Sequence, residues 1–274
     1  MKPAAFDFVR AASVAEASRC LKQAGGTARL VAGGQSLGPM LNLRLARPDL
    51  LVDITGIPEL SEVSGTDAAV TVGACVTTSN IEDGRLPGRG LEPLAAIAAN
   101  IAYRAVRNRG TIGGSFCHAD PAADWVTTLC ALGAECLIAG EAGKRTLPAH
   151  EFIRGAYENA LAPDEVLAAI KIPRLSPRGR WGYQKICRKA GEFAMAMAAV
   201  LLDPERDVFR AVIGATHGKP VLVADARVLQ RADGSLDESA MGRVLESHGI
   251  TDPLTRRQQA AALSRAFAQA RPLQ

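Results

Sequence analysis

The feature that most constrains this fold is a glycine-rich turn placed directly after a short apolar run. The turn lies in VAGGQSLGPM, residues 31–40. Before it, the sequence SVAE starting at Ser13 is a capping box for a helix, and a Gly-Gly pair should end that helix. A further apolar run, residues 50–54, predicts the next strand. We therefore expect residues 1 to about 55 to form a β/α unit with a glycine loop at the carboxyl end of one strand.

The glycine loop is compatible with three kinds of site, and the sequence excludes the first. A Walker A loop needs a lysine and then a serine or threonine after its second glycine, because the lysine charge neutralises the terminal phosphates. Here Gly38 is followed by Pro39 and Met40. The loop is therefore not a Walker A motif.

The second possibility is the nucleophile elbow of a serine hydrolase, because residues 34–38 match G-x-S-x-G around Ser36. The other members of a triad could follow in the chain order of such enzymes, from Asp120 or Asp124 and then His150 or His217. However, the hydrolase sheet builds several strands before its nucleophile, and only about 30 residues precede this serine. The hydrolase hypothesis is therefore disfavoured and kept as an alternative.

The third possibility is a cradle for a phosphate group, and a second glycine cluster supports it. That cluster, TIGGS at residues 111–115, again places small residues where backbone amides can approach an anion without side-chain clash. Two such loops, each followed by a helix start, could hold a pyrophosphate from two sides. The chain contains no G-x-G-x-x-G, which excludes a Rossmann dinucleotide site. From the residues alone, a phosphate cradle and a pair of ordinary turns are equally supported.

The remainder of the chain divides at PRLSPRGR, residues 173–180, which has no hydrophobic periodicity. Before this segment, the pattern predicts two short strands in 62–76, helices in 91–107 interrupted at Asn100, a buried helix over 125–132, and strands over 134–139 and 166–172. After it, the pattern predicts strands over 181–187, 194–202 and 208–215, and then three helical stretches ending near Ala270. The change in pattern marks the segment as a domain boundary.

Composition and charge exclude several classes of protein. Hydrophobic residues make up 48% and charged residues 22% of the 274 residues, as in ordinary globular proteins. The longest apolar run, 193–202, is about half of the ~20 residues that a membrane span needs. The net charge of +4 does not indicate nucleic-acid binding. The arginines at 104, 107 and 109 lack interleaved aromatic residues, so we expect them to be solvated or to contact another subunit.

The cysteines and the start of the chain favour a reduced, cytoplasmic protein. Six cysteines occur without any C-x-x-C pair, which argues against a disulfide scaffold, a zinc ribbon or a self-contained iron–sulfur site. The N-terminal residues show no secretory signal. His118, Asp120 and Asp124 invite a metal site beside Cys117, but the turn at Pro121 opposes it. We expect no metal in this chain.

Several segments together resemble one known family. AGGQS (32–36) and RNRGTIGGS (107–115) resemble the paired FAD-binding motifs of the medium subunit of molybdenum hydroxylases, of the carbon monoxide dehydrogenase and xanthine dehydrogenase type. HADPAAD (118–124) and YQKICRKAGEFA (183–194) extend the match, which covers essentially the whole chain. Both motifs in this order, with these flanks, are highly specific. The family match also opposes the metal site.

The resemblance implies an α+β fold with two domains. The first is a two-part FAD-binding domain of the PCMH type over residues 1–175, with subdomains at about 1–55 and 56–175. The second is a C-terminal α+β domain over 178–274, with a small antiparallel sheet and helices.

The resemblance also implies a set of FAD-binding residues. Two loops would bind the diphosphate through Ala32, Gly33, Gly34, Gln35, Ser36 and Leu37 and through Thr111, Ile112, Gly113, Gly114 and Ser115. Asp124 matches an acidic residue near the ADP half, and Leu167 and Lys185 match two further contacts. Phe193 falls where the family often places an aromatic ring against the isoalloxazine. The ordinary alternatives are a helix N-terminal charge for Asp124, a solvated strand lysine for Lys185 and a core residue for Phe193.

The implied function is electron transfer in a heteromeric complex, without a catalytic acid, base or nucleophile in this chain. A large subunit would hold the molybdenum–pterin cofactor, and a small subunit would hold two [2Fe–2S] clusters, in a dimer of heterotrimers. FAD in this chain would accept electrons from those clusters and pass them to an external acceptor. Some relatives carry a cysteine-bearing insertion for a further cluster, which this sequence lacks. An assembly scaffold without FAD is the alternative.

Overall fold

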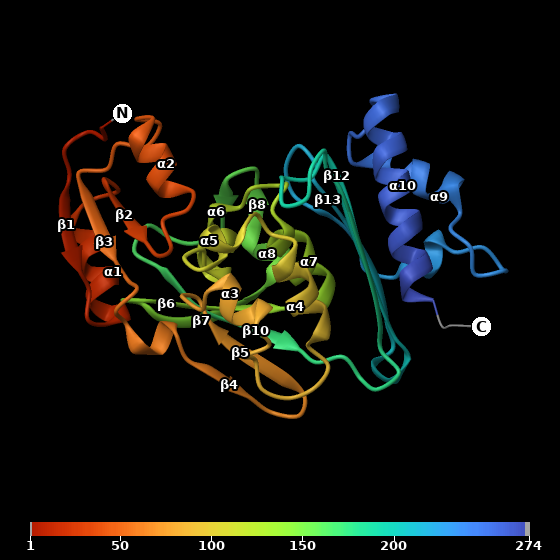
Figure 1. Ribbon diagram of the computed structural model, residues 1–274, viewed down its shortest axis with the longest axis horizontal. Coiled ribbons are helices and arrows are strands. Elements are labelled where there is room, and N and C mark those ends of the chain that lie inside the picture. Colours follow the sequence, from red (N-terminus) through yellow and green to blue (C-terminus); the bar gives the residue numbers. More distant parts are fainter. Residues whose placement is uncertain (1, 272–274) are drawn as a thin grey trace.

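A computed structural model of the protein describes residues 2–271. Figure 1 shows three main β-sheets in a row, with helices packed between them and beyond the last one. The N-terminal sheet lies at one end, and the helices α9 (Glu238–Ser247) and α10 (Pro253–Ala270) lie at the other. Each sheet has its own hydrophobic core cluster.

The first unit is a three-stranded parallel sheet with strand order β1-β3-β2. Its elements are β1 (Asp7–Arg10), α1 (Val14–Gln23), β2 (Ala28–Val31), α2 (Leu37–Asn42) and β3 (Leu50–Asp53). The capping box is confirmed, because the Ser13 hydroxyl accepts from the Glu16 amide at 3.1 Å and the Glu16 carboxylate accepts from the Ala12 amide at 2.8 Å. Strand β1 was not predicted, because most of its side chains are exposed and it shows no apolar alternation.

The central unit is a five-stranded antiparallel sheet with strand order β4-β5-β10-β6-β7. Its strands are β4 (Val63–Gly65), β5 (Ala69–Gly73), β6 (Glu135–Gly140), β7 (Gly143–Pro148) and β10 (Val166–Pro173). The helices of this unit are α3 (Thr78–Glu82), α4 (Glu92–Ala99), α5 (Arg104–Arg107), α6 (Ile112–His118), α7 (Asp124–Leu132) and α8 (Ala149–Phe152). Short elements complete it: η1 (Pro58–Leu60), β8 (Ile153–Gly155) and β9 (Glu158–Asn159). The expected helix interruption at Asn100 is confirmed, since this residue caps α4.

The third unit is a four-stranded antiparallel sheet with strand order β11-β12-β13-β14. Its elements are β11 (Arg180–Ile186), β12 (Ala196–Asp203), η2 (Pro204–Arg206), β13 (Val208–Gly214), β14 (Val221–Val223) and η3 (Ala226–Leu229), followed by α9 and α10. Two glycines allow helices to approach this sheet closely. A Cβ on Gly182 would lie 1.9 Å from the Ala266 carbonyl oxygen of α10, and a Cβ on Gly214 would lie 1.8 Å from the Thr127 hydroxyl of α7. Strand β12 is consequently buried almost throughout.

The α+β fold predicted from the sequence is confirmed, with the small antiparallel sheet and its helices in the C-terminal part. The three predicted strands there are present, and β14 is an additional short one. The first of the three expected helical stretches is the 3-10 turn η3. Within residues 2–271, no helix has both the length and the apolar character that a membrane crossing requires.

Candidate cofactor site

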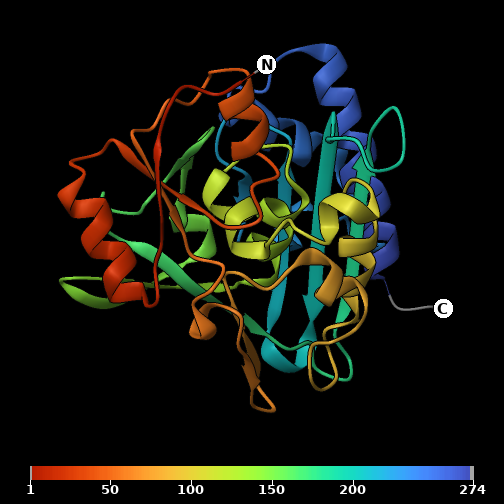
Figure 2. The same ribbon diagram turned by 60° about the vertical axis from the view of Figure 1, so that its left-hand side comes forward.

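The structure brings the two glycine loops together, although a large part of the central unit separates them in sequence. The first loop, residues 32–36, joins β2 to α2, and the second, residues 111–115, opens α6. A Cβ on Gly33 would lie 1.9 Å from the Arg109 carbonyl oxygen, and one on Gly114 would lie 3.8 Å from the Cβ of Ala32. In Figure 2 the orange segment with α2 accordingly lies beside the yellow-green segment with α6. The pair of loops is therefore one surface, made of small residues.

The first loop leaves its backbone donors available. Among the described residues, the amides of residues 33–37 donate no hydrogen bond to the protein. The turn depends on Gly34, whose φ of 69° lies in the left-handed region. The Gln35 side chain closes the turn by donating to the Gly33 carbonyl at 2.9 Å. Ser36 occupies the N-cap position of α2 without a side-chain capping bond. Consecutive free amides on a glycine turn form an anion-binding concavity.

The second loop uses its donors within the protein. The Thr111 hydroxyl accepts from the Gly114 amide at 3.0 Å, and the Ser115 amide donates to the Thr111 carbonyl. The Ile112 and Gly113 amides donate to the carbonyls of Val76 and Ala74. The second loop therefore differs from the first, because the amides of residues 112–115 already have acceptors within the protein. What that loop presents is the exposed backbone of Gly114 and the Ser115 hydroxyl.

Gly113 shows why the second loop needs small residues. A Cβ at this position would lie 2.4 Å from the Cβ of Ala74 and 2.6 Å from its carbonyl oxygen. The amide of Ala74 in turn donates to the carbonyl of Ala168, in β10. Gly113 therefore lets α6 pack against the central sheet. Leu167, the neighbouring residue of β10, is 3% exposed and belongs to the hydrophobic core beneath α6.

Asp124 and Lys185 are joined in a buried ion pair between α7 and β11. The Lys185 ammonium lies 2.9 Å from Oδ1 of Asp124, and the two side chains are only 8% and 6% exposed. The ammonium also donates to the Asn100 carbonyl at 3.0 Å. The Tyr183 hydroxyl donates to Oδ1 of Asp124 at 2.7 Å. Lys185 is thus not a solvated strand lysine, and Asp124 is not a simple helix N-terminal charge.

Phe193 is exposed rather than part of the core. Its side chain is 64% exposed in the connection between β11 and β12, and Met195 beside it is 46% exposed. The connection packs on the loop after α4, because a Cβ on Gly191 would lie 2.6 Å from the Ala102 carbonyl oxygen. Tyr103, on that loop, is 69% exposed. The apolar rings at this point are available to a ligand or a partner.

Two arginines near the second loop form ion pairs within the protein: Arg107 is largely buried, contrary to the expectation of a solvated side chain, whereas Arg104 remains 47% exposed. Arg104 pairs with Glu82 at 2.8 Å and with Asp83 at 2.7 Å, and Arg107 pairs with Glu82 at 2.7 Å. Arg107 also donates to the carbonyls of Ile101 and Ala102, both at 3.0 Å. Its hydrogen bond to Glu82 is the main reason why the pKa of that carboxyl is lowered. These contacts fix the chain that leads into the second loop, and no sequence pattern indicated them.

Three of the candidate triad and metal residues, Asp120, Asp124 and His118, make other contacts. Asp124 is occupied by Lys185 and Tyr183, and the Asp120 carboxylate accepts from the Ala122 amide at 2.9 Å. The His118 ring packs against the Tyr157 ring, with centroids 5.2 Å apart. Within residues 2–271, no three His, Cys, Asp or Glu side chains are grouped so that they could hold a metal ion. The cysteines are free, and burial raises the pKa of Cys75 and of Cys130 to about 12.

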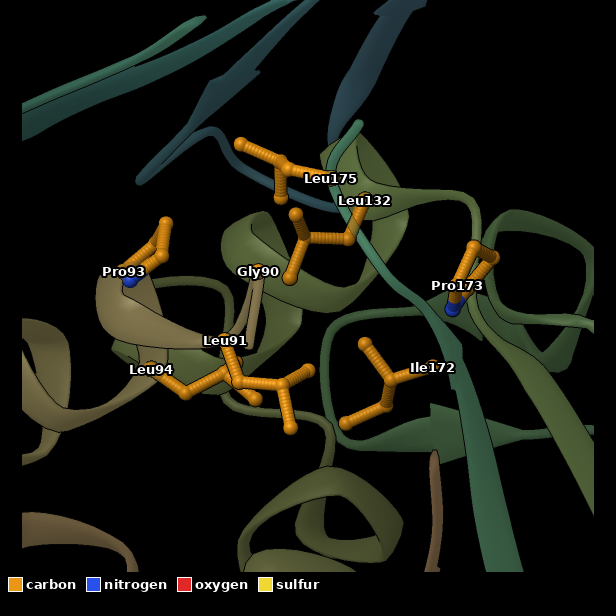
Figure 3. Close-up of a pocket in the computed structure, with 8 residues that line it drawn as sticks. All are labelled: Gly90, Leu91, Pro93, Leu94, Leu132, Ile172, Pro173 and Leu175. Carbon is orange, nitrogen blue, oxygen red and sulfur yellow. The ribbon is translucent and has the colours of Figure 1, made fainter. Parts of the chain in front are cut away.

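Figure 3 shows the residues that line a small apolar pocket. Its lining is Gly90, Leu91, Pro93, Leu94, Leu132, Ile172, Pro173 and Leu175. None of these residues belongs to either glycine loop, and none carries a polar side chain. The pocket therefore offers no group that could recognise a phosphate.

Comparison with protein families identifies the region that holds both loops. The family described as FAD binding domain in molybdopterin dehydrogenase matches residues 4–175. Subunit alpha of the 6-hydroxypseudooxynicotine dehydrogenase complex of Paenarthrobacter nicotinovorans is 35% identical over 252 residues, which cover 91% of this chain and 82% of that protein. The carbon monoxide dehydrogenase medium chain of Hydrogenophaga pseudoflava is 38% identical over 202 residues, covering 74% and 70% of the two chains.

Solved structures match nearly the full length of this chain. A chain of carbon monoxide dehydrogenase from Hydrogenophaga pseudoflava superposes with a TM-score of 0.89 at 30% identity, covering 98% of each chain. A chain of quinoline 2-oxidoreductase from Pseudomonas putida 86 gives a TM-score of 0.83 at 32% identity, with the same coverage of both chains. The similarity therefore extends through the C-terminal unit, beyond the residues that the family description matches.

Proposed function

This chain belongs to the FAD-binding medium subunits of molybdenum hydroxylases, an oxidoreductase family, and we propose that it transfers electrons within such a complex. Electrons would arrive from [2Fe–2S] clusters of a small subunit, after a large molybdenum–pterin subunit has oxidised the substrate. FAD held by this chain would pass them to an external acceptor. The relatives are named as subunits or chains of dehydrogenases, which supports this role.

The observation that carries the proposal is the row of free amides on the first loop. Buried or half-buried amides without a partner cost free energy, and a diphosphate would supply acceptors for the amides of 33–37. The Ser36 and Ser115 hydroxyls, which have no hydrogen-bond partner among the described residues, could donate to the same group. The small-residue surface of both loops leaves room for close approach. The residues present therefore fit the diphosphate of FAD.

The other residues implied by the family would serve different parts of the cofactor. The exposed Phe193 ring would lie against the isoalloxazine, and Lys185 would supply a fixed positive charge nearby. Leu167 supports the site from the core, since its side chain is buried. Bound FAD supplies the electron chemistry, and the protein supplies position and electrostatic environment. No acid, base or nucleophile of this chain is required.

We further propose that the FAD-binding domain ends in residues 173–180 and that the chain works in a dimer of heterotrimers. The end of the family match at residue 175 supports the boundary. The exposed apolar side chains of Tyr103, Phe193 and Met195 support a contact with a cofactor or another subunit. Native mass spectrometry of the purified complex would measure the subunit ratio, and a ratio other than one to one to one would contradict the assembly.

The experiment that tests the function is an absorption spectrum of the purified complex, followed by heat release and mass spectrometry of the chromophore. We expect flavin bands and the released mass of FAD. A complex with intact molybdenum and iron–sulfur centres but no flavin would contradict the proposal and favour an assembly scaffold. Esterase activity that disappears in Ser36→Ala would instead support the serine hydrolase. The same spectrum on the isolated chain would show whether FAD stays bound without partners.

A further inference from the structure

The buried cluster around Lys185 joins side chains from three segments that are distant in sequence. Lys185 lies on β11, Asp124 opens α7, and Asn100 follows α4. The ammonium lies 2.9 Å and 3.1 Å from the two carboxylate oxygens of Asp124 and donates to the Asn100 carbonyl at 3.0 Å. An ammonium has three N–H donors, and these partners hold it from two directions. The lysine head is therefore fixed between the central and C-terminal units.

Tyr183 completes the cluster from the same face of β11. Its hydroxyl donates to Oδ1 of Asp124 at 2.7 Å and lies 3.8 Å from the Met197 sulfur. Burial, followed by the charge of Asp124, raises the pKa of Tyr183 well above its usual value. The phenol consequently stays protonated and remains a donor. Asp124 thus accepts from two side chains, which leaves it poorly suited to bind a cofactor hydroxyl as well.

A stabilising role alone does not account for this cluster. Taking two charges out of water costs free energy, and a buried ion pair is often no better for stability than apolar residues of similar volume. An ion pair that is 8% and 6% exposed, with a tyrosine added to it, is more readily explained by a need for a fixed charge. The ion pair lies where the central and C-terminal units meet, at a contact called the seam below. The exposed ring of Phe193 lies at the same seam, on the connection that follows β11.

We propose that Tyr183 and Asp124 are positioning residues for Lys185, which they hold as a fixed charge toward bound FAD. Tyr183 orients the carboxylate, and the carboxylate orients the ammonium. This inference rests on the proposed function, because it needs FAD at this seam. It replaces a direct contact between Asp124 and the cofactor with an indirect role.

The direction of the effect follows from Coulomb's law. Two-electron reduction of FAD with uptake of one proton adds one negative charge to the flavin, so a more positive electrostatic potential at the seam favours the reduced form. Tyr183→Phe removes the donor that orients Asp124, so the carboxylate no longer fixes the ammonium toward FAD, which should lower the midpoint potential of the flavin. Asp124→Asn removes the negative charge and should raise it. Lys185→Met removes the positive charge and should lower it.

The test is a double-mutant cycle on the purified complex, read out as the flavin midpoint potential in a spectroelectrochemical titration. We expect Tyr183→Phe to lower the potential in the wild-type background and to leave it unchanged in the Lys185→Met background. Tyr157→Phe is the matched control, because it removes a hydroxyl beside a different carboxylate, Asp120, at an exposed turn. The flavin midpoint potential of the Tyr157→Phe complex should equal that of the wild-type complex.

The outcomes separate this inference from the proposed function. A complex without flavin contradicts the proposed function. A complex that retains FAD but shows no potential shift in Tyr183→Phe, or the same shift with and without Lys185, overturns the positioning role. If Tyr183→Phe fails to fold, Asp124→Asn is measured with and without Lys185: a potential shift that differs between the two backgrounds supports the role, and the same shift in both contradicts it.

Discussion

The two glycine loops look alike in sequence and differ in what their backbones do. In residues 33–37 the amides donate to no described residue, and the turn is formed by Gly34 at positive φ. In residues 112–115 each amide already has a protein acceptor, through Thr111, Ala74 and Val76. The first loop therefore has backbone donors free for the proposed diphosphate, and the second uses its donors to hold α6 against the sheet and close to the first.

This difference shows that a glycine in such a motif can serve either a ligand or the scaffold. Gly33 and Gly113 are needed because other backbone lies against them, at 1.9 Å and 2.6 Å from the Cβ that an alanine would add. Gly34 is needed for its φ, and a Cβ there would meet only one atom, 3.8 Å away. Substitutions at Gly33 and Gly113 should consequently act through steric overlap, and those at Gly34 through the backbone conformation.

The largest effect is expected for Gly33→Ala. The added Cβ would overlap the Arg109 carbonyl, so the two loops must move apart. Overpacking of this kind costs about 1–3 kcal/mol in the free energy of unfolding. We expect both a lowered midpoint in urea unfolding and a loss of FAD from the purified chain. Wild-type stability together with wild-type flavin content would show that the two loops are not in contact.

Gly34→Ala and Gly38→Ala, four positions apart, should have opposite effects on the free energy of unfolding. Gly34→Ala places a side chain at a φ of 69°, which costs about 1–2 kcal/mol. Gly38→Ala lies inside α2, where a Cβ would meet no atom within 4 Å, and replacing a helical glycine gains about 1 kcal/mol. Urea unfolding of the two variants measures both values. If both variants are destabilised equally, the assigned conformation of the first loop is wrong.

The hydroxyls of Ser36 and Thr111, which precede α2 and α6, are expected to differ in opposite ways in their effects on stability and on FAD affinity. Thr111→Ala removes the capping bond to the Gly114 amide and should cost about 1 kcal/mol of stability. Ser36→Ala removes no capping bond, so stability should change by less than about 0.5 kcal/mol. FAD binding should show the reverse order, with affinity about tenfold weaker in Ser36→Ala because a hydrogen bond to a charged group is lost. Equal loss of affinity in both variants would contradict the division of roles.

The smallest expected effect is a loss of stability in acid. Burial acts to raise the pKa of Asp53, but hydrogen bonds from Thr55 and Arg10 outweigh it and lower the value. The pKa of Glu82 is lowered mainly by its hydrogen bond to Arg107. Both groups therefore stabilise the fold fully above their ordinary pKa of about 4, and this contribution is lost as the pH falls through the lowered values.

Variants at these two carboxyls assign the acid effect to one loop or the other. Asp53→Asn should weaken the acid dependence of the unit that carries the first loop, and Glu82→Gln that of the chain entering the second. Unfolding curves from pH 6 down to about 3 measure the difference from wild type. A dependence that is unchanged in both variants would exclude these carboxyls as its source.

Local signals in the sequence were sufficient for much of this fold. The capping box at Ser13, the apolar runs of β2 and β3 and the two short strands in 62–76 depend on neighbouring residues, and the structure contains each of them. Strand β1 gave no such signal, because its stability comes from pairing with β3 rather than from its own apolar side chains. Elements with a local cause could be predicted, and those formed by pairing could not.

The chemistry of the site depended on long-range contacts that a single sequence does not display. Lys185 meets Asp124 across 61 positions, and Arg107 meets Glu82 across 25. Nothing in the spacing of these residues indicates that they pair. The same holds for the second loop, whose amides bond to Ala74 and Val76. The motifs showed which residue types are present. Only the structure shows which backbone amides are free and which are bonded within the protein.

If FAD binds as proposed, only the first loop offers it free amides. The most direct measurement is hydrogen–deuterium exchange of the chain with and without bound FAD, resolved to the peptides that contain 33–37 and 112–115. We predict that FAD strongly slows exchange in 33–37, whereas 112–115 is already slow without it and changes little. Equal protection of both loops by FAD, or fast exchange of 112–115 in the FAD-free chain, would contradict the account.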